Sequence, residues 1–205
     1  KRPFDHRLTV RDTGFVLQPN HTANTIQDYY RELSADEARN RLILDDVIRA
    51  LEEGRSPILL TERRDHLQFF AEQLRGTAKN LVILQGGMGT KQRRECQERM
   101  ASIPADEERL VLATGRFIGE GFDDTRLDTL FLAMPVSWKG TLVQYAGRLH
   151  RRHSPKVEVR VFDYVDRRVP MLARMFEKRL AGYRSMGYSI AAAEPADLAT
   201  AQPRA

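Results

Sequence analysis

The sequence predicts an α/β fold in which helices cover both faces of a parallel β-sheet. Short apolar runs alternate with amphipathic segments along most of the chain, which is the pattern of repeated β–α–β units. The apolar runs are continuous rather than alternating with polar residues, as is typical of strands buried on both faces. Glycine-rich and polar stretches follow these runs, so we expect ligands to gather at the carboxyl edge of the sheet.

Composition narrows the class of protein. The 205 residues suffice for one sizeable domain, and 41% apolar with 30% charged residues is ordinary for a globular protein. The single cysteine, Cys96, excludes a disulfide framework and a thiolate zinc cluster, and it favours a reducing compartment, so we expect a cytoplasmic protein. No run approaches the roughly 20 apolar residues of a membrane helix, so no membrane partner is expected. The net charge of +5 is compatible with a polyanionic partner.

The chain divides into four segments by pattern. Residues 1–33 are expected to form an N-terminal segment with a small hairpin that turns at residues 12–14. Residues 34–166 form the predicted α/β domain, and residues 167–190 form an amphipathic C-terminal helix. Residues 191–205 lack a core-forming pattern and are expected to be a flexible tail.

Within the domain, Ser34 and Glu37 form a capping box that predicts the start of the first helix, and Gly54 predicts its end. Strands are expected at 57–61, 81–84, 109–114, 129–134 and 157–165. Helices are expected at 63–76, with Gly76 as the stop, and at 141–149, and residues 86–103 are expected to form a glycine-rich turn that leads into a basic helix. The stretches TER, QGGMGT, TGRFIGEGFDD and MPVSWKG follow strands, so they should line one edge of the sheet together with the helix that carries QYAGRLHRR.

The stretch QYAGRLHRRH at 144–153 is the strongest candidate for chemistry. Arg148 and Arg151 are one helical turn apart and are expected to share a face. Facing a partner domain, they can neutralise charge on a phosphoryl group during transfer, which is typically worth about 10³ to 10⁵ in rate. The alternative is a solvated basic face, or carboxylate pairing within the fold. Neither a Walker loop nor G-x-G-x-x-G is present, so the chain is not expected to hold a nucleotide by itself.

The order of the motifs suggests a family. ATGRFIGEGFDDTRLDTLFLA followed by QYAGRLHR resembles motifs V and VI of superfamily 2 helicases, PILLTERRDHLQFFAEQL resembles motif IV, and LQGGMGTKQRRE resembles the motif that follows it. The resemblance covers about residues 55–165 and is greatest to DEAD/DEAH helicases of the restriction-enzyme R subunit type, including those of conflict systems. It implies a second RecA-like lobe, with the first lobe, its Walker loop and its acidic box upstream of Lys1.

The resemblance also implies an ATP-facing side, with ATP and Mg²⁺ bound mainly by the absent first lobe. Arg151 matches the preferred arginine finger, and Arg148 lies beside it. Gln144 orders the phosphate-side water or links to the first lobe, and Gly147 either permits close lobe contact or is a helix-packing glycine. The motif V loop near the nucleotide contains Glu120, Gly121 and Asp123, whereas the neighbouring Asp124 is interpreted as a turn or cap residue.

A second set of residues is implied to contact nucleic acid, with DNA expected and RNA possible. These residues grip phosphates and sugars without reading bases, and they are Thr61, Arg63, Gly86, Gly87, Thr114 and Gly115. Thr90 either caps the helix after the glycines or contacts a phosphate. Trp138 either stacks on a base or packs under its loop. No metal site is expected, because His150 and His153 lack companion ligands at metal spacing.

The resemblance therefore implies the second motor lobe of an ATP-dependent nucleic-acid helicase or translocase. The partner of this lobe is the N-terminal RecA-like lobe of the same full-length chain, and the second lobe alone is expected to hydrolyse no ATP. The alternative is a non-catalytic module of the same fold that binds nucleic acid or protein passively. A glycosyltransferase-like lobe shares the alternating pattern but leaves the QYAGRLHRR stretch unexplained.

Overall fold

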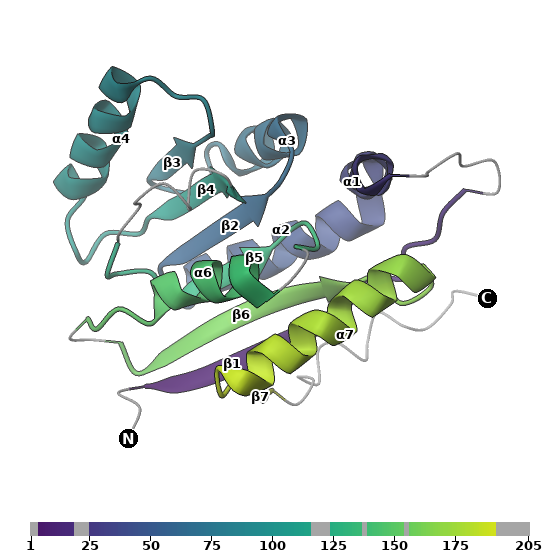
Figure 1. Ribbon diagram of the computed structural model, residues 1–205. Helices are drawn as coiled ribbons and strands as arrows, with labels where there is room; N and C mark the ends of the chain where they lie inside the picture. The colour runs from purple at the N-terminus through teal and green to yellow at the C-terminus, as the bar shows by residue number, and fades with distance from the viewer. Residues whose placement is uncertain (1–3, 19–24, 116–123, 137–138, 154–155, 192–205) are drawn as a thin grey trace, which may run out of the picture.

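The computed structural model describes residues 4–18, 25–115, 124–136, 139–153 and 156–191. In this part of the chain, seven strands form one sheet in the order β3-β4-β2-β5-β6-β1-β7, and every pairing is parallel (Figure 1). The strands are β1 (Asp5–Asp12), β2 (Pro57–Thr61), β3 (Leu81–Leu84), β4 (Leu110–Thr114), β5 (Thr129–Leu132), β6 (Glu158–Val165) and β7 (Ser189–Ile190). The predicted parallel α/β fold is confirmed.

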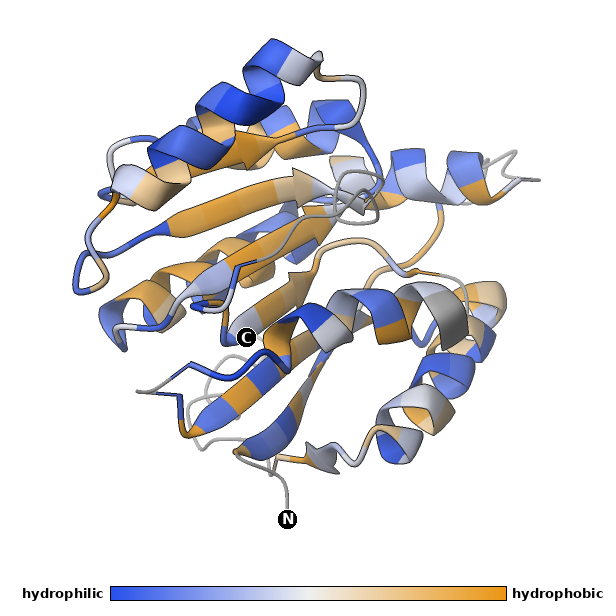
Figure 2. Cartoon of the chain, turned by 60° about the vertical axis from the view of Figure 1, so that its left-hand side comes forward, coloured by the Kyte–Doolittle hydropathy of each residue, from blue (hydrophilic) through white to orange (hydrophobic). Residues whose placement is uncertain are grey.

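Helices cover both faces of the sheet. They are α1 (Ile26–Ala35), α2 (Glu37–Glu52), α3 (Arg64–Leu74), α4 (Thr90–Ser102), α6 (Lys139–Leu149) and α7 (Pro170–Ser185). One apolar core joins α4, α6 and α7 to the sheet, and a second joins α2 and α3 to its other face. Figure 2 shows the apolar strands between helices whose outer faces are hydrophilic. Among the described residues, no helix has the length and apolar character needed to cross a bilayer.

The N-terminal segment corrects the prediction of a hairpin. Asp5–Asp12 is one strand that lies between β6 and β7, with Leu8 opposite both Val161 and Ile190. The turn signal at residues 12–14 only ends this strand, where Gly14 has a φ of +67° and its amide donates to the Asp12 side chain. Side chains alternate between the two faces of the strand, and this buries Leu8 in the core beneath α6 and α7. As part of the large sheet, β1 therefore has this core contact and two neighbouring strands, whereas a strand in a local hairpin would have one.

The first helices also begin at residues other than those predicted. Thr25 and Asp28 form a capping box at the start of α1, which the sequence pattern did not indicate. Ser34 lies in the last turn of α1, and its hydroxyl donates to a carbonyl of the preceding turn, so the predicted capping box at Ser34 is wrong. Asp36 caps α2 instead, accepting a 2.7 Å hydrogen bond from the Arg39 amide.

Hydrogen bonds to buried carboxylates connect α7 to one face of β6 and α2 to the other face. On one face, Asp163 accepts two hydrogen bonds from the guanidinium of Arg179 in α7, at 2.7 and 2.8 Å. On the other face, Asp46 of α2 accepts from the Tyr164 hydroxyl and from Arg11 of β1, both at 3.0 Å. Because these groups are buried, their polar pairing specifies how α2 and α7 lie against the sheet.

Candidate functional site

Three strand ends meet at the carboxyl edge of the sheet, in a region that we call the strand-end rim (residues 61–64, 86, 87, 114 and 115). Thr61 and Thr114 lie opposite each other at the ends of β2 and β4. The Gly86 amide, after β3, donates to the Thr114 hydroxyl oxygen at 2.8 Å, and its carbonyl accepts from Arg64 at 2.6 Å. Hydrogen bonds therefore join the loops after all three strands, as the positions of these polar stretches predicted.

Thr61 has its hydroxyl engaged inside the protein. Its Oγ1 lies 3.0 Å from Nδ1 of His66, whose Nε2 lies 2.8 Å from Oδ1 of Asn40 in α2. Thr61, His66 and Asn40 are all buried, so the side chain of Thr61 connects the end of β2 to helices α2 and α3. Thr61 therefore supports the rim from inside the protein.

Arg63 and the glycine loop are also tied locally. Arg63 makes a two-point ion pair with Asp65 at 2.9 and 2.5 Å, and this pairing raises the pKa of the guanidinium. Gly87 has a φ of +87°, and a Cβ at this position would meet the Arg64 guanidinium. Gly89 is the N-cap of α4, so the prediction that Thr90 caps this helix is wrong by one residue, and Thr90 begins the helix instead.

Gly115 is covered by two side chains from other elements. The Tyr145 hydroxyl, from α6, donates to Oε1 of Glu62 at 3.3 Å, and both oxygens occupy the space that a Cβ at position 115 would need. Glu62 is exposed as a residue, but crowding by surrounding protein atoms raises the pKa of its carboxyl group. Glycine at position 115 therefore permits a contact between the rim and α6.

Helix α6 has one buried and one outward face. Its apolar side pairs with the core through Leu142, Tyr145, Ala146 and Leu149. Val143 and Gln144 are exposed, and Gly147 and Arg148 are half-buried one turn further along. A Cβ at Gly147 would have no heavy atom within 4 Å, so packing inside this chain does not require glycine there. The helix-packing interpretation of Gly147 is thus wrong for the described residues.

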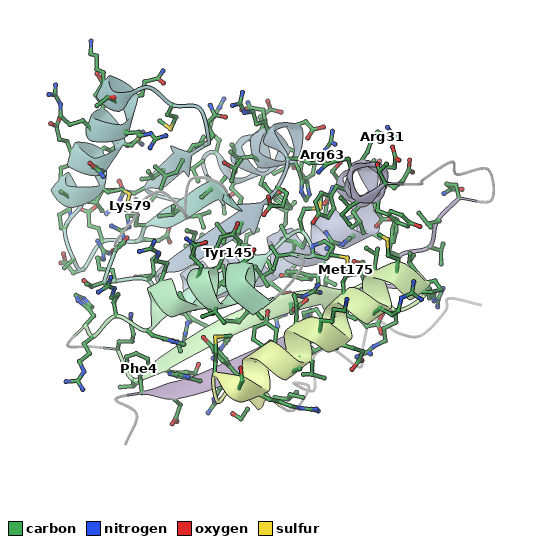
Figure 3. All side chains as sticks on the ribbon, viewed as in Figure 1. Phe4, Arg31, Arg63, Lys79, Tyr145 and Met175 are labelled. Atoms are coloured by element: carbon green, nitrogen blue, oxygen red, sulfur yellow. The ribbon has the colours of Figure 1, made fainter. Side chains whose placement is uncertain are left out.

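Helix α6 ends at Leu149, as predicted. Arg151 therefore lies in a bend beyond the helix and does not share a helical face with Arg148, so the expectation of a shared face is wrong. The helix also runs back across the sheet, because the chain must return to the amino edge before the parallel strand β6. His150 accordingly contacts His6 near the start of β1. Figure 3 shows Arg63 at the rim and Phe4 near the opposite edge. Arg151, which follows His150, therefore lies away from the strand-end rim, whereas the middle of α6 contacts the rim through Tyr145.

Several predicted residues lie outside the part of the chain that the structure describes. Glu120, Gly121, Asp123 and Trp138 belong to this group. Asp124 is described and forms a turn, in which its Oδ1 accepts from the Arg126 amide while its Oδ2 pairs with Arg109. Its interpretation as a turn residue is confirmed.

The sequence pattern missed the side chains that hold the rim together. Glu62 and Arg64 stand next to predicted residues, but their partners come from α6 and from the loop after β3. Tyr145 and His66 occupy ordinary core positions of amphipathic helices, so no local signal distinguished them. A hollow of about 620 Å³ opens elsewhere, over β1, β6 and β7 beside α2. It is lined by none of the predicted residues, and its arginines Arg11, Arg160 and Arg167 pair with Asp46, Glu53 and Asp12.

The described residues contain no group of three or more His, Cys, Asp or Glu side chains placed to hold a metal ion. The structure instead contains two candidate binding surfaces. One is the outward face of α6, where open space surrounds Gly147, and the other is the strand-end rim, where hydrogen bonds join the loops.

The profile of the family described as helicase conserved C-terminal domain matches residues 40–153. The chain belongs to this helicase family.

Comparison with individual proteins agrees with this assignment. The helicase domain is 30% identical over 151 residues to the transcript termination protein OPG145 of Monkeypox virus, a match that covers 72% of this chain and 30% of that protein. The crystal structure of T4 UvsW superposes with a TM-score of 0.68 at 14% identity, covering 92% of this chain and 41% of that one. S. cerevisiae Dbp5 bound to RNA and ADP BeF3 superposes with a TM-score of 0.55 at 12% identity, covering 91% and 40%.

The family match makes this a helicase C-terminal domain, and the structural likenesses agree with its RecA-like fold. The matched chains are longer, and this domain spans 30% of the viral protein. The kinship with restriction-enzyme R subunits stays a prediction.

Proposed function

We propose that this domain is the second motor lobe of an ATP-dependent nucleic-acid helicase or translocase. The observation that supports the proposal most strongly is the outward face of α6, where Gln144, Gly147 and Arg148 lie. These residues fall within the part of the chain that matches the helicase family. A helix with an unfilled glycine and long polar side chains on its outer face is suited to close contact with another domain. The N-terminal RecA-like lobe of the full-length chain is the partner that fits this contact.

In this proposal, ATP and Mg²⁺ are held mainly by the first lobe, and the nucleotide supplies the phosphoryl group that is transferred to water. Arg151, which is exposed, neutralises charge that develops on that group, and Arg148 supports it. Gln144 orders the phosphate-side water or links to the first lobe. Gly147 lets the first lobe approach the helix backbone. Glu120, Gly121 and Asp123 are assigned to the nucleotide side on the motif resemblance alone.

Nucleic acid is proposed to bind at the strand-end rim. On the motif resemblance, Gly86, Gly87, Gly115 and the ends of β2 and β4 contact phosphates and sugars. Of these residues, Gly87 is exposed and is the most accessible to a ligand, whereas the Gly86 amide and carbonyl already bond to Thr114 and Arg64. The start of α4 adds a helix N-terminus, whose first amides have no carbonyl partner within the helix and favour phosphate. Dbp5, a protein of similar fold, has been solved with RNA, and we leave DNA as the expected ligand here with RNA as the alternative.

The test replaces Arg151 by alanine in the full-length protein, with Arg152→Ala as the matched control, because both arginines are exposed neighbours. Arg151→Ala should lower kcat for ATP hydrolysis at saturating nucleic acid by about 10³-fold, whereas Arg152→Ala should stay within about twofold. Unchanged turnover in Arg151→Ala would favour the passive interaction module instead. The lobe alone should turn over no more ATP than its Arg148→Ala/Arg151→Ala double variant.

A further inference from the structure

His150, in the turn that follows α6, contacts residues from the N-terminal strand and from the segment after α7. The ring of His150 stacks on the ring of His6 in β1, with centroids 4.3 Å apart and planes 9° from parallel. On the same residue, Nε2 of His150 lies 2.9 Å from the Tyr188 hydroxyl, just after α7. His150 stands between Arg148 and Arg151, so these contacts fix the segment that carries the proposed arginines.

The gripping residues are themselves firmly held. His6 and Tyr188 are 9% and 6% exposed, and Nδ1 of His6 lies 3.2 Å from the Met186 carbonyl, to which it can donate. The ring of Phe4 packs against His6, and the ring of Tyr183 packs edge-on against Tyr188. A buried aromatic group that is fixed on several sides gives the turn a rigid support.

The backbone of the turn has a separate support. The ammonium group of Lys156 donates to the carbonyls of Leu149 and Arg151, at 2.9 Å each. A cation at this position satisfies carbonyls that the end of α6 leaves without helical partners, and it complements the negative end of the helix dipole. The main chain of Arg151 is therefore held by a residue that precedes β6, while the ring of His150 is held by β1 and the segment after α7.

We propose that His6, Lys156 and Tyr188, together with His150, form a clamp that positions Arg151 toward the transferring phosphoryl group. This inference rests on the proposed function. A flexible arginine side chain reaches a target in one geometry more readily when its main chain is fixed, because fewer degrees of freedom are left to order. A displacement of about 1 Å at such a group can cost about 100-fold in rate. The members of the clamp are thus positioning residues, since none of them touches the nucleotide in this proposal.

The clamp gives the two ends of the chain a role in the reaction. His6, Lys156 and Tyr188 all lie outside residues 40–153, which match the helicase family. In this proposal, strand β1 and the segment after α7 extend the sheet and also position Arg151, which lies within the residues that match the family.

The experiment removes one hydroxyl from the clamp in the full-length protein. Tyr188→Phe deletes the partner of His150 Nε2 and keeps the packing ring. We expect kcat at saturating nucleic acid to fall about tenfold, with the KM for ATP and the affinity for nucleic acid unchanged within about twofold. The matched control is Tyr183→Phe, which deletes a hydroxyl bound to Asp163 and leaves the His150 contact intact. It should lower the free energy of unfolding without lowering kcat.

A second measurement separates positioning from a general loss of structure. In the Arg151→Ala background, Tyr188→Phe should cause no further fall in kcat, because the residue that it positions is already gone. His150→Gln, which removes the ring stack, should behave in the same way. A full additional loss in that background, or wild-type kcat in Tyr188→Phe, would overturn the clamp. If Arg151→Ala itself keeps wild-type turnover, the proposed function fails first.

Discussion

At the scale of single residues, His66 shows how the fold holds a titratable group in one protonation state. Asn40 donates through Nδ2 to the Ser34 carbonyl, so its Oδ1 is the acceptor for the Nε2–H of His66. Nδ1 of His66 is then unprotonated and accepts from the Thr61 hydroxyl. Burial, together with a smaller contribution from the charge of Arg39, lowers the pKa of His66 from 6.5 to about 3. The neutral ring is therefore part of the rim structure at neutral pH.

Stability should fall in acid because of this ring. The unfolded chain binds a proton at His66 near pH 6.5 and the folded chain only near pH 3, so the free energy of unfolding decreases as the pH falls through that window. From pH 7 to pH 5 the loss at this residue should be about 2 kcal/mol. Urea unfolding at both pH values should show this difference for the wild type and a smaller one for His66→Gln, which lacks the titration. Equal differences in the two proteins would show that His66 is not the group responsible.

At the scale of elements, helix boundaries depend on which polar side chain reaches the free amides. Both Ser34 and Asp36 stand where a cap is chemically reasonable, and Glu37 follows three positions after Ser34, as in a capping box. The structure uses Asp36, because α1 continues to Ala35 and leaves Ser34 inside a helix. The continuation of α1 is favoured by contacts far along the chain, such as the hydrogen bond from the Tyr30 hydroxyl to the Pro135 carbonyl at 2.7 Å.

Replacing each candidate cap by alanine distinguishes the two boundaries. Asp36→Ala should lower the free energy of unfolding by about 1 kcal/mol, because the Arg39 amide loses its side-chain acceptor. Ser34→Ala should change it by less than about 0.5 kcal/mol, since the Ser34 hydroxyl only donates to a nearby carbonyl. Chemical denaturation of the two variants measures both values. The reverse order of effects would restore the boundary that the sequence pattern predicted.

At the scale of the whole molecule, buried ion pairs join layers that are distant in sequence. Arg179 and Asp163 are each 1% exposed in their side chains, and the Tyr183 hydroxyl adds a third hydrogen bond to the same carboxylate. Arg39 in α2 similarly pairs with Asp166, just after β6, and donates to the Ala133 carbonyl. These ion pairs connect α7 and α2 to the C-terminal parts of β5 and β6, so they fix the helices on both faces relative to the sheet.

Removing one partner of a buried pair should be costly. Arg179→Met leaves the Asp163 carboxylate buried without its cation, and we expect a loss of about 3 to 5 kcal/mol in the free energy of unfolding. The matched control is Arg94→Met, which breaks an exposed pair with Glu98 on α4 and should cost less than about 0.5 kcal/mol. Denaturation curves for both variants test the difference. Similar small losses in the two would mean that the buried pair contributes little to stability.

The candidate site was predictable where residues follow strands directly. Thr61, Gly86 and Thr114 lie at the rim because parallel strands bring their carboxyl ends to one edge. Their partners were not predictable, since Tyr145 and His66 have the pattern of ordinary core residues. The predicted helix end at Leu149 is correct, but the shared face of Arg148 and Arg151 is wrong. Periodicity does not show the turn that Lys156 holds through the Leu149 and Arg151 carbonyls.

The sequence by itself determined the parallel α/β class and the succession of strands and helices along residues 57–165, because apolar periodicity and turn residues are local properties. It also contains the motifs that mark a helicase domain. Only the tertiary structure decided that the N-terminal segment forms strand β1 between β6 and β7. It also decided that His6 and Tyr188 both contact His150. Strand pairing and ring stacking join residues far apart along the chain, and their free energy depends on the folded surroundings rather than on neighbouring residues.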